Sequence, residues 1–111
     1  MKLPNPDRAV VEMEKLSGYC LDPAHPSGRH KARVFLSALG ITSVQAGFLR
    51  DALLVTAMNH ECRERTRSRF GVLYEIEFAC EYQGRCATLC SSWIIRTGED
   101  FARLTSCYVV S

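Results

Sequence analysis

Apolar and polar residues alternate through positions 72–110, which is the pattern of half-buried β-strands. Gln83-Gly84 gives a turn signal in this stretch, and a second turn is expected at positions 97–100. The alternation therefore predicts an antiparallel meander of three strands, at 72–82, 85–96 and 101–110. Its apolar positions on the first two strands are Val72, Tyr74, Ile76, Phe78, Cys80, Tyr82, Ala87, Leu89, Trp93 and Ile95.

A hairpin centred on Gln83-Gly84 also predicts which residues face each other. Apolar residues then oppose apolar residues at each step, which stabilises a sheet and specifies its register. The expected pairs are Val72 with Ile95, Tyr74 with Trp93, Phe78 with Leu89, Leu104 with Trp93, and Tyr108 with Leu89.

Residues 1–60 show helical spacing instead. Four apolar positions at i, i+3, i+4 and i+7 predict a helix over 29–39, which Gly40 ends; they are Ala32, Phe35, Leu36 and Leu39. Thr42 and Gln45 have capping-box spacing, so a second helix should run from Thr42 to about His60 and pack across the sheet. A short helix or turn is expected at 12–21, a short edge strand near 9–11, and a basic connector at 61–70.

Helices followed by a meander predict an α+β fold in one domain, residues 1–111. The N-terminal helices should cover one face of a three- to four-stranded antiparallel sheet. That face carries Tyr74, Phe78, Leu89, Trp93 and Leu104. The opposite, more polar face is expected to be open to solvent or a ligand, with Glu75, Glu77, Cys90, Ser92, Arg103, Thr105 and Cys107.

Composition narrows the class of protein. No apolar run approaches the ~18 residues of a membrane span, and the opening Met1-Lys2-Leu3-Pro4-Asn5 is not a signal peptide, so we expect a cytoplasmic protein without a membrane partner. A formal net charge of +2 is too small to argue for nucleic-acid binding by itself.

The six cysteines are expected to be reduced thiols, mostly buried. Cys86 and Cys90 lie four apart on a strand, roughly 13 Å from each other, which is too far for a shared metal ion. We therefore expect no metal site and no cofactor. Cys90 and Cys107 oppose each other in the predicted register, and they too are predicted to stay reduced because bridging directly paired strand residues is strained.

The segment from His25 to Arg33 holds the densest set of candidate functional residues. It offers two imidazoles, His25 and His30, and three cations, Arg29, Lys31 and Arg33. General acid–base cleavage of a phosphodiester needs a group that accepts a proton, a group that donates one, and cations for the developing charge. The alternative interpretation is a solvated start of a helix with ordinary surface residues.

Two further sets of polar residues are candidates for anion binding. Arg63, Arg65, Arg67 and Arg69 alternate through the predicted connector and could follow a phosphate backbone. On the polar sheet face, Ser92 should oppose Thr105, with Glu75 in the same row and Arg103 one row away. A solvated connector and an exposed strand face explain the two sets equally well.

Three segments carry a resemblance to a known family: Leu3-Pro4-Asn5, residues 25–35, and residues 92–104. They resemble a family of small bacterial proteins that is catalogued only as a domain of unknown function. The resemblance spans nearly the whole chain and names no activity. The family usually has proline before the Arg103-Leu104 pair, where this chain has Ala102.

The order of the elements is also similar to that of the barnase–EndoU–colicin–RelE group of RNases, many of which are toxins. This resemblance concerns the fold only. It implies that His30 or His25 is the general base or acid, that Lys31, Arg29 and Arg103 hold phosphate, and that Thr105 or Ser92 positions the ribose.

We therefore expect a metal-independent RNase-like domain of a bacterial toxin module. Its catalytic residues should be His30, His25, Arg103 and Thr105, and its substrate-binding residues Arg29, Lys31, Arg33 and Ser92. The expected partners are RNA and a cognate antitoxin protein. The alternative is a non-enzymatic protein-interaction module. An RNase needs His and Arg in one cleft, whereas an interaction module should expose an apolar patch or a sheet edge.

Overall fold

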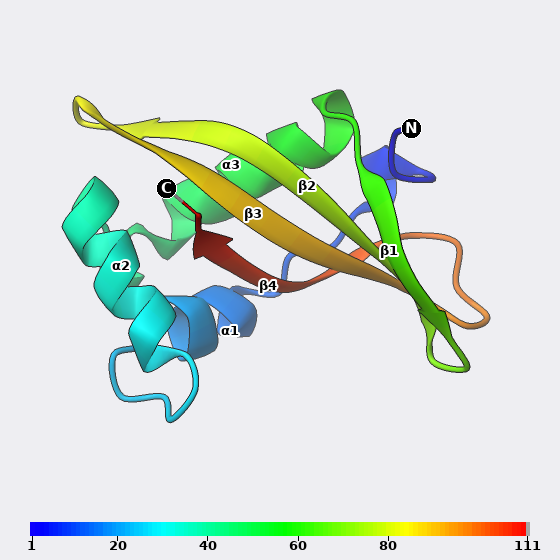
Figure 1. Ribbon diagram of the computed structural model, residues 1–111, viewed down its shortest axis with the longest axis horizontal. Coiled ribbons are helices and arrows are strands. Elements are labelled where there is room, and N and C mark those ends of the chain that lie inside the picture. The colour runs from blue at the N-terminus through cyan, green and yellow to red at the C-terminus, as the bar shows by residue number, and fades with distance from the viewer. Residues whose placement is uncertain (111) are drawn as a thin grey trace.

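Three helices from the N-terminal half pack against a four-stranded antiparallel sheet formed by the rest of the chain (Figure 1). The computed structural model describes residues 1–110. The predicted α+β class is therefore confirmed. The strands follow their sequence order across the sheet: β1 (Arg63–Ser68), β2 (Gly71–Tyr82), β3 (Arg85–Arg96) and β4 (Arg103–Val109).

The strand β1 replaces the connector predicted at 61–70, so that prediction was wrong. All six residues of β1 are exposed, and they pair with β2 along one edge of the sheet. Because every position is polar, β1 shows no apolar alternation from which a strand could be predicted. Its charged side chains are typical of edge strands that stay free of unwanted pairing.

The register predicted between β2 and β3 is confirmed, with Tyr74 opposite Trp93 and Phe78 opposite Leu89. Leu104 lies opposite Trp93 as expected. The next step differs, because Ser92 pairs with Ser106 and leaves Thr105 as an extra residue. This is a β-bulge, in which two residues of one strand face one residue of its neighbour.

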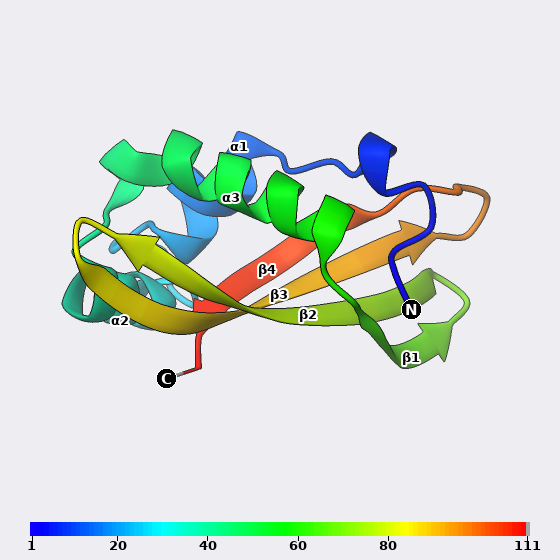
Figure 2. The same ribbon diagram turned by 90° about the horizontal axis from the view of Figure 1, so that it is seen from above.

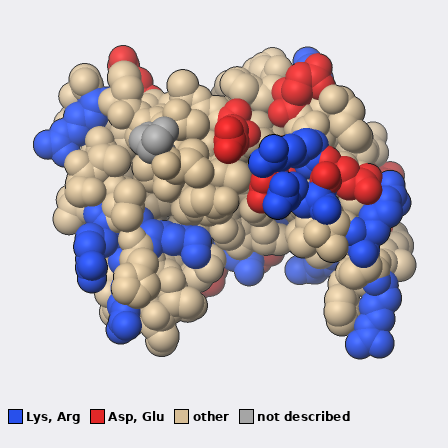
Figure 3. All heavy atoms as spheres, viewed as in Figure 1, with Lys and Arg blue, Asp and Glu red and all other residues tan. Residues whose placement is uncertain are grey.

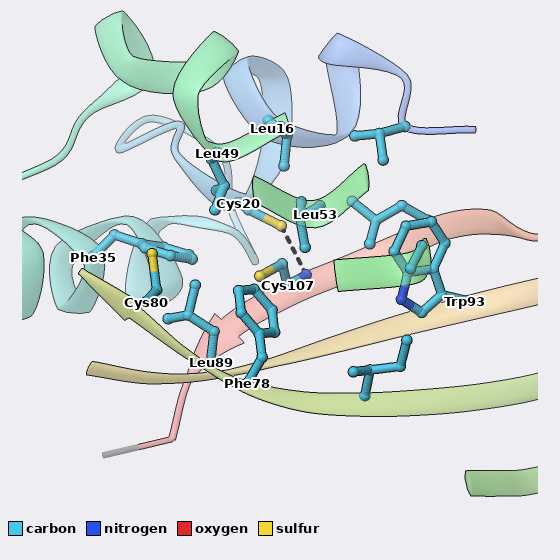
Figure 4. Packing of buried hydrophobic residues seen from close by; sticks show 14 of the residues in the cluster. Leu16, Cys20, Phe35, Leu49, Leu53, Phe78, Cys80, Leu89, Trp93 and Cys107 are labelled. Carbon is cyan, nitrogen blue, oxygen red and sulfur yellow. Dashed lines mark hydrogen bonds between the residues drawn. The ribbon is translucent and has the colours of Figure 1, made fainter. Parts of the chain in front are cut away.

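The bulge corrects three predictions. Ser92 opposes Ser106 rather than Thr105, Tyr108 opposes Cys90 rather than Leu89, and Cys107 opposes Ser91 rather than Cys90. A shift of one residue turns a strand's side chains to the other face. Cys107 therefore joins the core, where it is 0 % exposed, and its N–H donates to Cys20 Sγ at 3.3 Å (Figure 4).

The helices begin and end close to the predicted residues. The short helix α1 (Met13–Lys15) continues into the π-helical turn η2 (Leu16–Cys20), and a 3-10 turn η1 (Pro6–Arg8) precedes them. The helix α2 (Arg29–Leu39) ends at Gly40, whose positive φ of 71° suits glycine. Thr42 and Gln45 form the predicted capping box at the 3-10 turn η3 (Ser43–Gln45), which leads into α3 (Ala46–Asn59).

The core lies between the helices and one face of the sheet, here called the inner face. Figure 2 shows α3 along this face, and α2 packs against β3 and β4 near the end of β4. Phe35, Leu49 and Leu53 lie among the buried side chains, as do Phe78 and Leu89 (Figure 4). The expected edge strand near 9–11 is reduced to a single parallel bridge between Val10 and Arg103.

Trp93 is 0 % exposed at the centre of the inner face. Its indole N–H donates to Ser91 Oγ at 2.9 Å, and the Ser91 hydroxyl donates to the Ile76 carbonyl at 3.2 Å. A buried polar group without a partner is costly, so this chain of hydrogen bonds allows the indole to be fully buried.

Within residues 1–110, no single helix is long and apolar enough to cross a membrane. The helical segments Arg29–Leu39 and Ser43–Asn59 reach the length and composition of a membrane span only when they are taken together, and the chain bends by 81° between them.

Candidate functional site

Three hollows next to the β4 bulge are lined by residues from several parts of the chain. Ser106 lines one hollow with His30 and Lys31 of α2, and a second with Ser92 of β3 and Arg65 of β1. Thr105 also lines that second hollow, and it lines a third with His25. We call Ser92, Thr105, Ser106, His30 and Lys31 the bulge site. Bulges often occur next to functional sites, because they redirect side chains.

His30 presents an exposed imidazole in the first turn of α2. Val34, one turn further along the helix, lines the same hollow, as does Tyr108 of β4. No hydrogen bond joins the His30 ring to another described residue. Its two ring nitrogens are therefore available to a ligand in this hollow.

Lys31 is held in place by Tyr19 of η2. Its ammonium Nζ donates to the Tyr19 hydroxyl at 3.1 Å and lies 5.1 Å from the centre of that ring. A hydrogen bond and a cation–π contact restrict a side chain that is otherwise flexible. The cation beside His30 is therefore partly preorganised.

His25 is hydrogen-bonded to the turn that precedes α2. Its Nδ1 accepts hydrogen bonds from the backbone N–H groups of Ser27 at 3.0 Å and Gly28 at 2.9 Å. With Nδ1 acting as an acceptor, the neutral ring carries its proton on Nε2. His25 can thus donate a hydrogen bond to a ligand through Nε2, whereas protonation at Nδ1 would break its hydrogen bonds with the Ser27 and Gly28 N–H groups.

Gly28 allows the loop that carries His25 to pack closely against η2. A Cβ atom at this position would lie only 2.1 Å from the Tyr19 carbonyl oxygen. Close packing therefore explains why the Pro-Ser-Gly turn has glycine at its third position. The turn holds His25 beside Tyr19, whose ring centre is 4.9 Å from that of the imidazole.

The hydroxyl groups at the bulge come from both strands. Thr105 Oγ1 donates to the Ser92 carbonyl at 3.1 Å, which ties the extra residue to β3. The side chains of Ser92 and Ser106 belong to the outer face of the sheet, the face turned away from α3, and line the hollow there. The predicted pair of Ser92 and Thr105 is thus close in space, although through the bulge and not through the expected register.

Arg103 lies apart from the imidazoles. Its guanidinium donates to both carboxylate oxygens of Glu99, at 3.1 and 3.0 Å, and lies 3.8 Å from Glu12. The hydrogen bond to Arg103 is the main reason why the pKa of Glu99 is lowered. Arg103 lines none of the three hollows at the bulge, so the structure does not bring it together with His30.

The arginines of β1 are also largely paired with acidic residues. Glu75, on the outer face of β2, lies 3.1 Å from Arg63 and 3.5 Å from Arg65. Arg67 pairs with Glu64 at 2.8 Å. Figure 3 shows positive charge near β1 and α2, with mostly uncharged surface between them. The positive surface near the bulge site is therefore modest.

Arg29 and Arg33 occupy a different side of α2 from His30. They line a hollow with Leu36 and Ile41 that contains none of the bulge-site residues. The cations of the segment from His25 to Arg33 therefore do not act at one place. Lys31 joins His30, whereas Arg29 and Arg33 belong to a separate surface.

Ser106 and Tyr108 are site residues that the sequence interpretation missed. The hydrogen bond with Cys90 is the main reason why the pKa of Tyr108 is raised to about 12. A signal was present in the sequence, because unbroken alternation after Leu104 would place Ser106 and Tyr108 inside, and Cys107 and Val109 outside. The bulge turns Cys107 and Val109, the less polar pair, toward the core instead.

A metal site is not formed by the residues that are described. Among residues 1–110, no group of three His, Cys, Asp or Glu side chains gathers in a way that could hold a metal ion.

Comparison with known proteins gives one family. The family described as "Domain of unknown function (DUF6883)" matches residues 2–111. No curated protein and no solved structure matches the chain. The resemblance to the barnase–EndoU–colicin–RelE fold therefore gains no support from solved structures.

Proposed function

The chain belongs to this family of unknown function, and we propose from the bulge site that it is a metal-independent RNase-like domain of a bacterial toxin module. One observation carries the proposal. An imidazole without a partner among the described residues, His30, shares a hollow with a positioned cation, Lys31, and a hydroxyl-bearing strand, β4. These are groups that acid–base cleavage of an RNA phosphodiester requires.

His30 is the proton-transfer group in this proposal. The neutral imidazole ring has a lone pair on one of its nitrogens, and this nitrogen can accept a proton. The ring takes the proton of the ribose 2′-OH while the 2′-oxygen attacks phosphorus. The bond from phosphorus to the 5′-oxygen breaks, and this leaving oxygen takes a proton from water. The hydroxide formed takes the proton from His30, which restores the neutral ring. The products are a 2′,3′-cyclic phosphate and a 5′-hydroxyl end.

The other residues bind and orient the substrate. Lys31 neutralises the negative charge that develops on the phosphate oxygens. The Nε2–H of His25 is assigned as a hydrogen-bond donor, because its Nδ1 already accepts hydrogen bonds from the Ser27 and Gly28 N–H groups. Ser92 and Ser106 can bond to the ribose and the phosphate, and Thr105 fixes the bulge. Arg103 is assigned to the ion pairs with Glu99 and Glu12 rather than to phosphate.

The experiment is an RNA cleavage assay in EDTA. Purified wild-type protein should cleave mixed-sequence RNA, and His30→Ala should lower the rate by roughly 10²–10⁴-fold, as expected for loss of a general base. His60→Ala is the matched control, since His60 lies beside Phe78 and away from the bulge site. Intact RNA after incubation with folded wild-type protein would contradict the proposal, and so would equal loss of activity in the two variants.

A non-enzymatic protein-interaction module is the second candidate. The observation in its favour is the exposed apolar surface on α3 and η3, where Val44 is 84 % and Val55 is 60 % exposed, with Phe48 beside them. Large exposed apolar side chains that follow one helix are typical of surfaces that bind another protein. Wild-type protein that is folded but inactive on RNA would favour this second function.

A further inference from the structure

We propose that a groove between α2 and η3 binds an acidic peptide segment of a partner protein. An apolar side chain of the peptide fills the groove, and the acidic side chains that flank it bind the arginines at the rim. We call this the arginine groove. Its apolar wall is formed by Leu21, Ala32, Leu36 and Ile41, and its rim carries Arg29 and Arg33. The proposal goes beyond RNA cleavage, because it concerns a separate surface and a different class of ligand.

The groove has room for an apolar side chain. Its volume is about 350 Å³, within the range of roughly 300–1,000 Å³ that is typical of ligand pockets. Leu21 and Ile41 are buried beneath it, whereas Leu36 is 51 % exposed. Covering Leu36 with an apolar group would remove that surface from water, which favours binding.

The two arginines are placed to bind carboxylates. They lie four residues apart on α2 and therefore on one side of the helix. Neither has a carboxylate within ion-pair distance among residues 1–110, so both guanidinium groups can accept an acidic partner. Arg50, Arg69, Arg85 and Arg96 share this property, whereas Arg8, Arg63, Arg65, Arg67 and Arg103 are paired. A guanidinium binds a carboxylate through two parallel hydrogen bonds, so each arginine could hold one acidic side chain.

The position of Arg29 costs the fold some stability. Arg29 begins α2, and the first turn of this helix carries no acidic residue. A positive charge at the N-terminus of a helix interacts unfavourably with the helix dipole. No carboxylate within the described fold compensates the charge of Arg29 at this unfavourable position. We therefore infer that Arg29 has a role in binding.

The apolar wall favours a peptide over RNA as the occupant. A phosphate backbone can use the guanidinium groups but leaves Leu36 in contact with water. An acidic peptide with an apolar anchor satisfies both the charges and the wall. His30 points to the hollow on the other side of α2, so the peptide and RNA have separate sites.

The test is a selection from random twelve-residue peptides displayed on phage. Immobilised wild-type protein provides the selection, and the double variant Arg29→Ala/Arg33→Ala provides the counter-selection. Enriched peptides should carry Asp or Glu on both sides of a large apolar residue. The double variant Arg67→Ala/Arg69→Ala is the matched control, because it removes two positive charges from β1 and the turn that follows it.

A synthetic enriched peptide should bind the wild-type protein and the β1 control equally. Its affinity for Arg29→Ala/Arg33→Ala should fall about tenfold, since exposed ion pairs contribute up to ~1 kcal/mol each. Leu36→Ser should also lower the affinity, and denaturant melts should show that every variant is folded. Selection of basic peptides, no enrichment over the counter-selection, or displacement of the peptide by a short RNA would overturn the proposal.

Discussion

The two faces of the sheet differ in what determines their structure. On the inner face, Phe78, Leu89 and Trp93 are buried against the helices in the register that alternation predicts. On the outer face, the polar side chains near β4 are arranged by the bulge at Thr105 and by the hydrogen bond from the Thr105 hydroxyl to the Ser92 carbonyl. The inner face thus follows from hydrophobic burial, whereas the outer face depends on a local irregularity.

This difference separates stability from function. Burial of apolar area stabilises the protein wherever the side chains fit, so the inner face needs little beyond a correct pattern. A binding site needs particular groups at particular places, and the bulge provides them by turning Ser106 and Tyr108 outward. Changes on the inner face should therefore affect folding, and changes at the bulge site should affect binding.

The largest effect is expected for Trp93→Ala. Removing this buried indole should lower the free energy of unfolding by about 3–5 kcal/mol, measured in denaturant melts. Ile94→Ala is the control, because Ile94 is the next residue and lies on the outer face, only partly buried. A loss below about 1 kcal/mol for Trp93→Ala would contradict its place in the core.

A smaller loss of stability is expected for Gly28→Ala, which tests the packing of the loop that carries His25 against η2. The added Cβ would lie 2.1 Å from the Tyr19 carbonyl oxygen, so the loop or η2 must move, at a cost of about 1–3 kcal/mol. The matched change Gly47→Ala in α3 meets nothing within 4 Å and should stabilise the helix by roughly 0.5–1 kcal/mol. Equal effects in thermal melts would contradict the close packing at Gly28.

The thiols distinguish the two faces directly. Cys90 belongs to the outer face but is only 1 % exposed, and it lies directly opposite Tyr108 of β4. Tyr108→Ala should therefore make Cys90 reactive toward a thiol reagent in the folded protein, in addition to the exposed Cys86. Cys107 should stay unreactive until the protein unfolds. Mass spectrometry identifies the labelled cysteine, and labelling of Cys107 instead would contradict the bulge.

The smallest effect concerns pH and the ion pair of Glu99 with Arg103. The pKa of Glu99 is lowered in the folded state by the hydrogen bond from Arg103. The stabilisation is therefore fully present above the unfolded pKa of about 4.3 and is lost as the pH falls through the lower, folded value. Wild-type protein should lose more stability than Glu99→Gln between about pH 5 and pH 3 in denaturant melts. Parallel losses in the two proteins would show that the pair does not affect folding.

Much of the fold could be predicted from sequence because burial leaves a periodic pattern. The helix over 29–39 with its end at Gly40, the capping box of Thr42 and Gln45, and the pairing of β2 with β3 all follow from such patterns. The strand β1 could not be predicted in this way, because no position in Arg63–Ser68 is apolar.

The candidate site could be predicted only in part. The sequence showed that His25, His30 and Lys31 lie close along the chain. It did not show which of their side-chain atoms are hydrogen-bonded to neighbouring residues. The hydrogen bonds from the Ser27 and Gly28 N–H groups to His25 Nδ1 depend on the direction of a side chain, which residue spacing does not show. The same is true of the bond between Arg103 and Glu99. As a result, both ring nitrogens of His30 are free of hydrogen bonds to the described residues, whereas Nδ1 of His25 is not.

Chemical-shift mapping with a short 2′-O-methyl RNA, which cannot be cleaved by attack of the 2′-oxygen, tests the proposal that the bulge site binds RNA. In ¹H–¹⁵N spectra of the wild-type protein, the largest changes should occur at the backbone amides of His30, Lys31, Ser92 and Ser106, around the bulge of β4. Amides in the middle of α3, such as that of Leu53, should not change. The assignment of the bulge site would be contradicted by changes confined to α3 or to the arginine groove. It would also be contradicted if no change occurred at RNA concentrations near 1 mM, which correspond to a binding free energy of about −4 kcal/mol.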